Sequence, residues 1–303
     1  MRFSPRASRL LIVLLLVASA AALAPSSLAA ETTKAPSAPA VVSGEWLSAA
    51  LGSKDLVLLD ARPMRDFLAA HLQGAQSVAV ENLRSTSGGV PATTYPPEVL
   101  GVVFARAGVT SGSHVVVYGA ESDNDATYVA TAALIAGARK VSVLDGGFSR
   151  WTAEARATTK DRSLIPVAKP TLPGDTSFLV PIDDVKKRIG DERTVFLDVR
   201  PEEQWAAGRI PGARNRFWKK DVDGGSFRPE AATRAELEEA GVSWERPVVV
   251  YCNSGHQASE TFYTLRFRLG HPDVRLYQGS WLEWSMTPGA PRESSAPAEP
   301  AAK

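Results

Sequence analysis

The residue best suited to chemistry is Cys252, the only cysteine in the 303-residue chain. It lies in the stretch VVVYCNSGHQASETFYTLR, where an apolar run of valines gives way to a helical pattern. A single cysteine cannot form a disulfide within its own chain. It is therefore a buried small side chain, a link to another chain, or a reactive thiol. The residues around it favour the reactive thiol.

The loop CNSGHQ has the features of a cradle for an anion on sulfur. It follows a predicted strand and precedes a helix expected to begin near Ala258, so the backbone N–H groups of the turn lack internal partners. Gly255 permits the tight curvature that such a turn needs. No acidic side chain lies between Cys252 and Ser259. We therefore expect the pKa of the thiol to be lowered, which would make it a nucleophile able to carry a covalent adduct.

The chain contains an internal repeat, which shows how the domain around the cysteine loop is organised. The block LVLLDARPMRDFLAAHLQGA recurs as TVFLDVRPEEQWAAGRIPGA at an offset of 138 residues, so that Asp60 matches Asp198. Two later blocks recur at an offset of 133 residues: HVVVYG with PVVVYC, and VSVLDGGFSRW with VRLYQGSWLEW. Three blocks in the same order indicate two copies of one domain. The difference in offset falls in a segment rich in Gly, Pro and Thr around TSGGVPATTYPP.

Each copy reads as an open α/β sheet. The runs TVFLDV and PVVVYC are continuous and rich in valine, as expected of parallel strands covered on both faces. After Cys252, the side chains of Phe262, Leu265 and Leu269 share one helical face, and Gly270 supplies a C-terminal stop. Strands that alternate with helices predict a mainly parallel sheet flanked by helices. Cys252 then lies at the carboxyl end of a strand, where such folds build their sites.

The first copy is expected to be catalytically inactive. Gly119 stands where the second copy has Cys252, and the loop after it carries Glu121, Asp123 and Asp125. These carboxylates would repel an anion and raise the pKa of any thiol placed there. We therefore expect the first copy to form one wall of a cleft between the domains.

The termini are expected to lie outside the fold. Three arginines, the apolar run LLIVLLLVASAAALA and the small residues SLA make residues 1–29 a secretory signal peptide, with an uncleaved anchor as the alternative. This places the mature chain in the periplasm or outside the cell, not in a membrane. We assign 42–155 to the inactive domain, 156–176 to a linker, 177–290 to the catalytic domain and 291–303 to a disordered tail.

Overall composition excludes some classes of function. The chain is 44% hydrophobic and 22% charged, which is ordinary for a globular protein. Its formal net charge of +1 gives no reason to expect nucleic acid as a partner. The histidines are scattered and one cysteine offers no ligand cluster, so we expect no metal site.

The tandem copies, the block LDVRPEEQWAAGRIPGA and the loop YCNSGHQA together resemble the rhodaneses, a family of thiosulfate and mercaptopyruvate sulfurtransferases. The resemblance runs over Val42–Trp284 and implies two tandem rhodanese-like domains. It implies that Cys252 takes a sulfane sulfur from a small-molecule donor as a persulfide and passes it to cyanide, a small thiol or a protein thiol, with no cofactor. It also implies the donor-binding residues, which are Arg200 and the loop residues Asn253, Ser254, Gly255, His256 and Gln257.

Departures from the family pattern leave the donor open. Gln204 stands where the family usually has Glu, Arg209 stands where it often has His, and CNSGHQ matches neither the thiosulfate nor the mercaptopyruvate type of loop. Thiosulfate is favoured, 3-mercaptopyruvate is the alternative, and a persulfide carrier without rapid turnover would use the same residues. His256 either tunes the sulfur or faces solvent. Lys219 and Lys220 either add positive potential to the cleft or belong to a solvated loop.

Two further interpretations concern the arginines. Because the pair Asp198 and Arg200 recurs as Asp60 and Arg62 in the inactive copy, a structural role is favoured for Asp198 and stays open for Arg200.

A cysteine phosphatase would need a loop one residue longer that ends in an arginine, which binds the phosphate oxygens. The next arginine after Cys252 is Arg266, well down the helix, so this class is disfavoured.

Overall fold

The computed structural model describes residues 38–295. The expected signal peptide, 1–29, lies outside the described residues, and so do residues 296–303. None of the helices within 38–295 has the length and apolar character needed to cross a bilayer.

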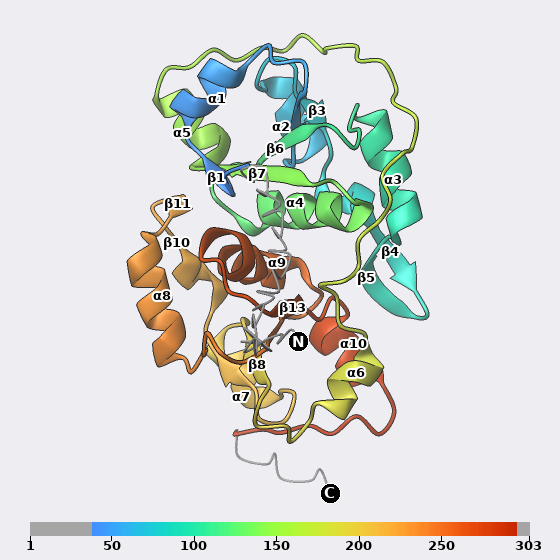
Figure 1. Cartoon of the computed structure of the whole chain (residues 1–303), viewed down its shortest axis with the longest axis vertical. Helices are drawn as coiled ribbons and strands as arrows, with labels where there is room; N and C mark the ends of the chain where they lie inside the picture. Colours follow the sequence, from blue (N-terminus) through green and yellow to red (C-terminus); the bar gives the residue numbers. More distant parts are fainter. Residues whose placement is uncertain (1–37, 296–303) are drawn as a thin grey trace, which may run out of the picture. The chain divides into compact units, whose positions relative to one another are not determined.

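The first half of the described chain is built on a five-stranded parallel sheet in the order β1-β7-β6-β2-β3 (Figure 1). Its strands are β1 (Val41–Val42), β2 (Leu56–Asp60), β3 (Gln76–Ser77), β6 (His114–Tyr118) and β7 (Lys140–Leu144). The helices are α1 (Gly44–Ala50), α2 (Met64–Ala69), a 3₁₀ turn (Val80–Leu83), α3 (Pro97–Arg106), α4 (Asn124–Ala136) and α5 (Gly147–Ala153). Neighbouring side chains of β6 enter different cores: Val115 and Val117 pack toward α3 and α4, and Val116 packs toward α1, α2 and α5.

The second half repeats this plan with a four-stranded parallel sheet in the order β13-β12-β8-β9. Its strands are β8 (Val195–Asp198), β9 (Arg214–Asn215), β12 (Val248–Tyr251) and β13 (Val274–Leu276). The helices are α6 (Ile182–Lys187), α7 (Glu202–Ala207), a 3₁₀ turn (Trp218–Asp221), α8 (Glu230–Glu239), α9 (His256–Tyr263), which runs on as a π turn (Thr264–Arg268), and α10 (Ser280–Met286). The predicted fold, two tandem α/β domains with parallel sheets flanked by helices, is confirmed.

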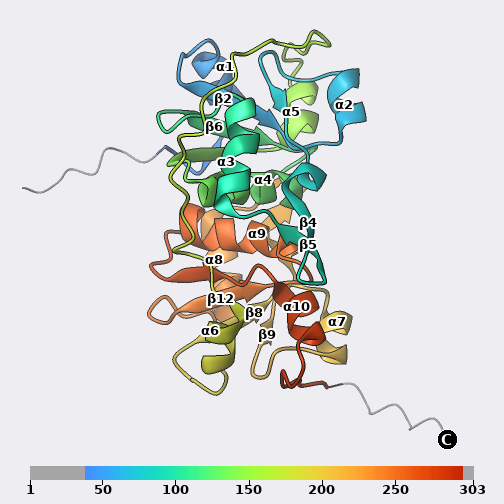
Figure 2. The same ribbon diagram turned by 90° about the vertical axis from the view of Figure 1, so that its right-hand side faces the viewer.

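The two halves meet through α4 and α9, which lie against each other in both views (Figure 2). One apolar core runs through this contact and includes Ala126 and Val129 of α4 with Phe262 of α9. A hydrogen bond 2.9 Å long crosses it from Thr127 Oγ1 to Glu260 Oε2. The helix that follows Cys252 is therefore packed against the first half.

Each half also carries a two-stranded antiparallel hairpin, and the two hairpins differ in length. The long hairpin, β4 (Arg84–Ser87) with β5 (Val90–Thr94), belongs to the first half. The short hairpin, β10 (Val222–Asp223) with β11 (Ser226–Phe227), belongs to the second. The change of offset between the repeated blocks is therefore located in the first-half hairpin, which is five residues longer.

The connecting segments are held by backbone bonds. Residues 156–176 form no regular element of their own and run along the first half, where Thr159 pairs with His71 and Ala168 N donates to Ala105 O.

The prediction that the tail 291–303 is disordered was wrong for its first residues. Glu293 accepts hydrogen bonds from Arg209 Nη2 at 2.6 Å and from the Gly212 N–H at 2.8 Å, so 291–295 is fixed to the second half.

Candidate active site

Cys252 directly follows β12, at the carboxyl end of the second sheet, and only 1% of its surface is exposed. The helix α9 begins at His256, two residues earlier than expected, because Gly255 turns the chain at φ = 80°. A Cβ atom at this glycine would lie 2.7 Å from the carbonyl oxygen of Gln278. Both the left-handed conformation and the close neighbour therefore require glycine in the loop.

The thiol of Cys252 faces converging backbone amides, but its pKa moves opposite to the expectation. Burial raises the pKa of the thiol, while the N–H groups of Ala258, Ser254, Gly255 and Gln257 favour the thiolate and oppose that rise. The predicted cradle is present. The prediction of a lowered pKa was wrong because loss of solvent around the sulfur outweighs the four amides.

Ser280, which was not among the predicted site residues, supports the cysteine loop by hydrogen bonds to its backbone. The Oγ atom of Ser280 accepts hydrogen bonds from Cys252 N at 3.2 Å and Gly255 N at 3.0 Å, and donates one to Tyr277 O at 2.8 Å. Ser280 is fully buried and has φ = 55°, in the region that favours glycine. The repeat contained a signal for it, because the matching residue of the inactive copy is Gly147.

The structure corrects the expectation that Arg200 holds an anionic donor. Its side chain is 2% exposed and pairs with Asp198, with Nη2 2.6 Å from Oδ2. The same Nη2 donates to Gly208 O at 2.7 Å, and the guanidinium lies over the Trp281 ring. A guanidinium that is buried and committed in this way is not available to a donor in the cleft.

Four loop side chains are partly exposed: Asn253, Ser254, Gln257 and His256. Asn253 Nδ2 donates to Gln204 Oε1 at 2.8 Å, which ties the loop to α7. Ser254 is half-buried. Gln257 is half-buried too, and its Oε1 has no hydrogen-bond partner within the described part of the chain. Asn253 and Ser254 can therefore contact a bound molecule without breaking a buried hydrogen bond, whereas the Gln257 Oε1 atom is itself buried.

His256 turns toward the first half, which neither of the two expectations anticipated. Its Nε2 atom lies 2.7 Å from Asp125 Oδ1, a distance typical of an ion pair although the angles are not those of a hydrogen bond. Its ring meets the ring of Tyr128 edge-on at 5.1 Å. Lys219 and Lys220 have exposed side chains on their 3₁₀ turn, in line with the solvated-loop interpretation.

The first half supplies a polar wall near the cysteine. The hydroxyl of Tyr128 lies 2.6 Å from Thr94 Oγ1, and Thr94 pairs with Arg84 across the long hairpin. Burial raises the pKa of Tyr128, the Thr94 bond and the charge of Arg84 lower it, and a negative charge on Cys252 raises it further. The charges of Arg84 and Cys252 therefore both act on the phenol of Tyr128.

The inactive copy has its own cradle, but a carboxylate fills it. Asp123 Oδ1 lies where a side chain on Gly119 would begin, and it accepts the N–H of Ala126 at 3.1 Å. Burial raises the pKa of Asp123 to about 6. In the first half the side chain of Asp123 therefore occupies the space that the Cys252 side chain takes in the second half. Within residues 38–295 no cluster of three potential ligands suited to a metal ion occurs.

The sequence model of the rhodanese-like domain matches residues 43–154 and 181–287. The chain therefore belongs to the rhodanese family. It is 30% identical to a putative thiosulfate sulfurtransferase of Synechococcus elongatus, over 93% of each chain. It is also 27% identical to the sulfur carrier protein TtuD of Thermus thermophilus, over 83% of this chain and 95% of the relative.

A solved structure agrees with these relatives. The crystal structure of SseA from Escherichia coli, a 3-mercaptopyruvate sulfurtransferase, superposes with a TM-score of 0.75 at 25% identity, covering 80% of this chain and 99% of that one. Taken together, the comparisons support a sulfurtransferase of the thiosulfate or 3-mercaptopyruvate type.

Proposed function

We propose that this chain moves sulfane sulfur from thiosulfate to cyanide or a thiol through a persulfide on Cys252. The observation that carries the proposal is the convergence of four backbone N–H groups on the only thiol of the chain, at the carboxyl end of a parallel sheet. The inactive copy has a carboxylate in the same place. Of the two loops, only the second therefore combines a nucleophile with a cradle that no carboxylate fills.

In the first step, the thiolate of Cys252 attacks the outer sulfur of thiosulfate. A sulfur–sulfur bond forms to Cys252, the bond between the two thiosulfate sulfurs breaks, and sulfite leaves with the electron pair. The new anionic sulfur then lies among the loop amides. Their N–H groups stabilise its negative charge, as they stabilise the thiolate of Cys252. In the second step, an acceptor attacks that sulfur and Cys252 leaves as a thiolate.

Arg84 is our candidate for the cation that attracts the donor, in place of Arg200. Its guanidinium is about a quarter exposed, and within residues 38–295 its one ion pair is a long contact, 3.5 Å, with Glu81. Its charge acts on Tyr128, which the charge of Cys252 also reaches. A dianionic donor that approaches Tyr128 between the halves would be attracted by this guanidinium.

Steady-state turnover of thiosulfate with cyanide tests the proposal. The wild type is expected to form thiocyanate over many turnovers, and Cys252→Ser is expected to abolish it while thermal unfolding stays unchanged. Treatment with thiosulfate should add about 32 Da to the peptide that carries Cys252, and cyanide should remove it. Activity retained by Cys252→Ser would refute the assignment.

A persulfide carrier is the second candidate, and the burial of Cys252 favours it. A thiol that is 1% exposed, with a raised pKa, would load slowly and discharge only to a partner that reaches into the cleft. A single turnover of loading without multiple turnover would identify this function. Replacing thiosulfate by 3-mercaptopyruvate in the same assay decides between the two donors.

We further propose that residues 1–29 direct export of the protein to the periplasm or out of the cell.

A further inference from the structure

The internal repeat allows the helix after the cysteine loop to be compared with the helix after the inactive loop. Asp123 and His256 occupy matching positions of the two copies, at the offset of 133 residues. Asp123 caps its own helix, α4: its side chain accepts the N–H of Ala126 at 3.1 Å and lies where a side chain on Gly119 would begin. The first turn of α4 is therefore fixed by a side chain of its own loop.

The first turn of α9 has no such cap. Gly255 stands at the capping position, and within residues 38–295 no side chain accepts a hydrogen bond there as a cap. A cap would engage the N–H groups of Gln257 and Ala258, the second and third residues of the helix. These two N–H groups favour the thiolate of Cys252 instead. Because a cap and the cradle would compete for the same groups, the turn needs support from outside its own helix.

Helix α4 of the inactive half provides this support through His256. The Nε2 atom of His256 lies 2.7 Å from Asp125 Oδ1, and its ring meets the ring of Tyr128 edge-on at 5.1 Å. The backbone of His256 is connected to the same helix. Ser259 Oγ donates to His256 O at 2.6 Å and lies 3.3 Å from Thr127 Oγ1. Both the side chain and the carbonyl of the first residue of α9 are therefore held against α4.

The pair of His256 and Asp125 is partly shielded from solvent. The side chain of His256 is 19% exposed and that of Asp125 is 39% exposed. Asp125 lies in the first turn of α4, where the helix dipole favours a carboxylate. Within residues 38–295 His256 is its one ion-pair partner. The carboxylate is thus held by one helix and paired with the first residue of the other.

We propose that Asp125 is a positioning residue for the reaction: through His256 it fixes the first turn of α9, so that the N–H groups of the cradle stay directed at the sulfur. This inference rests on the proposed function and gives the inactive half a part in it. Neither side chain needs to touch the donor or the acceptor. Preorganised N–H groups stabilise a sulfur anion without reorganising when the charge forms, and a loose first turn would forfeit that advantage.

A double-mutant cycle tests the proposal, with Asp125→Asn, His256→Gln and the two combined. The rate at which iodoacetamide alkylates Cys252 is measured against pH for each variant. The midpoint of this profile reports how well the thiolate is stabilised, and the plateau reports access to the thiol. Each single variant is expected to raise the midpoint by about half a pH unit, the amount that a partly exposed ion pair predicts. The double variant should shift it no further than either single variant, because both break one contact.

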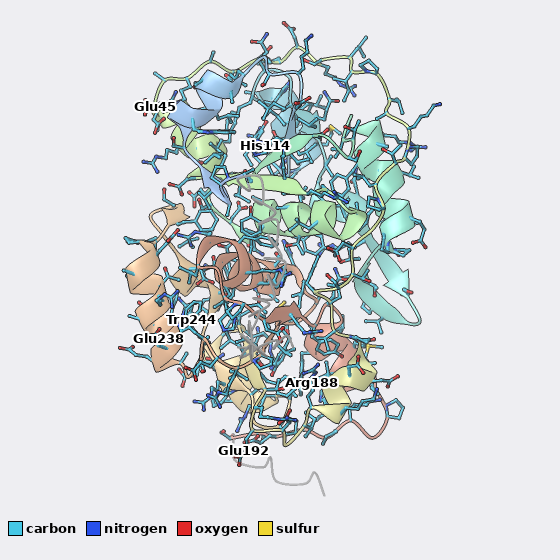
Figure 3. The ribbon with its side chains drawn as sticks, viewed as in Figure 1. Glu45, His114, Arg188, Glu192, Glu238 and Trp244 are labelled. Carbon is cyan, nitrogen blue, oxygen red and sulfur yellow. The ribbon has the colours of Figure 1, made fainter. Side chains whose placement is uncertain are left out.

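A direct effect of charge on the thiol predicts a different pattern. Removing the carboxylate of Asp125 would then lower the midpoint, whereas removing a positive charge at His256 would raise it, and the two shifts would add. The control is Glu45→Gln, which removes an exposed carboxylate from the first turn of α1 (Figure 3). Its midpoint should equal that of the wild type.

Turnover provides the second measurement. The value of kcat/KM for thiosulfate, with cyanide as acceptor, should fall about threefold in each single variant and no further in the double variant. Thermal unfolding checks that each variant is folded. A midpoint that is unchanged or lowered in folded Asp125→Asn, or shifts that add in the double variant, would overturn this inference alone. Absence of thiosulfate–cyanide turnover in the wild type would overturn the proposed function, while the midpoints would still measure the effect of Asp125 on the cradle.

Discussion

Arg200 and Asp198 form a buried ion pair in which Nη2 and Oδ2 are 2.6 Å apart. Arg62 and Asp60 form the same pair at the same distance in the inactive half. In each pair the arginine also donates to a carbonyl after the next helix, Gly208 O in one half and Ala70 O in the other. Because both copies contain this arrangement and only one has a nucleophile, the pair belongs to the fold.

The first prediction compares the two arginines as matched variants. Arg200→Ala and Arg62→Ala should each lower the free energy of unfolding by about 3–5 kcal/mol, since each leaves a buried carboxylate unpaired. Urea denaturation measures this loss. The KM for thiosulfate should be unchanged in both variants under conditions where they are folded. A KM rise confined to Arg200→Ala, with stability intact, would return Arg200 to the donor site.

The second prediction concerns Arg84. Arg84→Gln should raise the KM for thiosulfate about fivefold, because it removes a partly exposed guanidinium of the first half whose charge acts on Tyr128, as the charge of Cys252 does. Arg65→Gln is the matched control, since its side chain is exposed on α2. The KM for cyanide should not rise. A thiosulfate KM equal to that of the wild type would remove Arg84 from the donor path.

The third prediction follows from the raised pKa of Cys252. In the free protein the thiol should stay protonated at neutral pH, because desolvation favours the neutral form over the thiolate. Alkylation by iodoacetamide should therefore be slow at pH 7 and accelerate as pH rises past the ordinary range of a cysteine. Peptide mass spectrometry after timed quenching gives the rate. A plateau reached below pH 8 would mean that the four loop amides prevail over burial.

The fold could be predicted from the sequence because the evidence for it is local and repeated. The runs of valine before Tyr118 and Tyr251 identify central parallel strands, and the matching blocks around Asp60 and Asp198 show that the domain occurs twice. The need for Gly255 was also visible, since a sharp turn between strand and helix favours glycine.

The site was less predictable because burial and long-range contacts control it. The pKa of Cys252 depends on how deeply the folded chain buries the thiol, which the residue types around the loop do not reveal. Arg200 could equally face a ligand or a buried carboxylate until its exposure was known. Ser280 lies 28 positions from Cys252, and only the structure brings its hydroxyl to the loop amides.

The fourth prediction tests Ser280 as a positioning residue. Ser280→Ala removes the acceptor for two buried N–H groups, so we expect kcat/KM for thiosulfate to fall about tenfold, in line with a lost hydrogen bond to buried donors. Ser280→Gly makes the same deletion but relieves the positive φ. If the hydroxyl positions the loop, both variants lose activity alike although the glycine variant is the more stable. A loss that tracks stability alone would indicate a purely structural role.

The last prediction concerns Glu260, which is fully buried on α9 at the contact with α4. One carboxyl oxygen accepts the hydroxyl of Thr127, and the other has no partner within the described residues. Burial, with the charge of Asp221 adding to it, raises the pKa of Glu260 to about 8. The folded chain therefore holds a proton on Glu260 at pH values where the unfolded chain has released it.

The sign of the effect follows from this difference in proton binding. The stabilisation is complete below the ordinary pKa of glutamate and is lost as pH rises toward 8, by up to about 1.4 kcal/mol per pH unit. Glu260→Gln keeps the shape and cannot titrate, so its free energy of unfolding should exceed that of the wild type at pH 9 and approach it at pH 5. Urea denaturation at pH 5, 7 and 9 measures the gap. A gap that stays constant with pH would show that Glu260 is already ionised within the contact between α4 and α9.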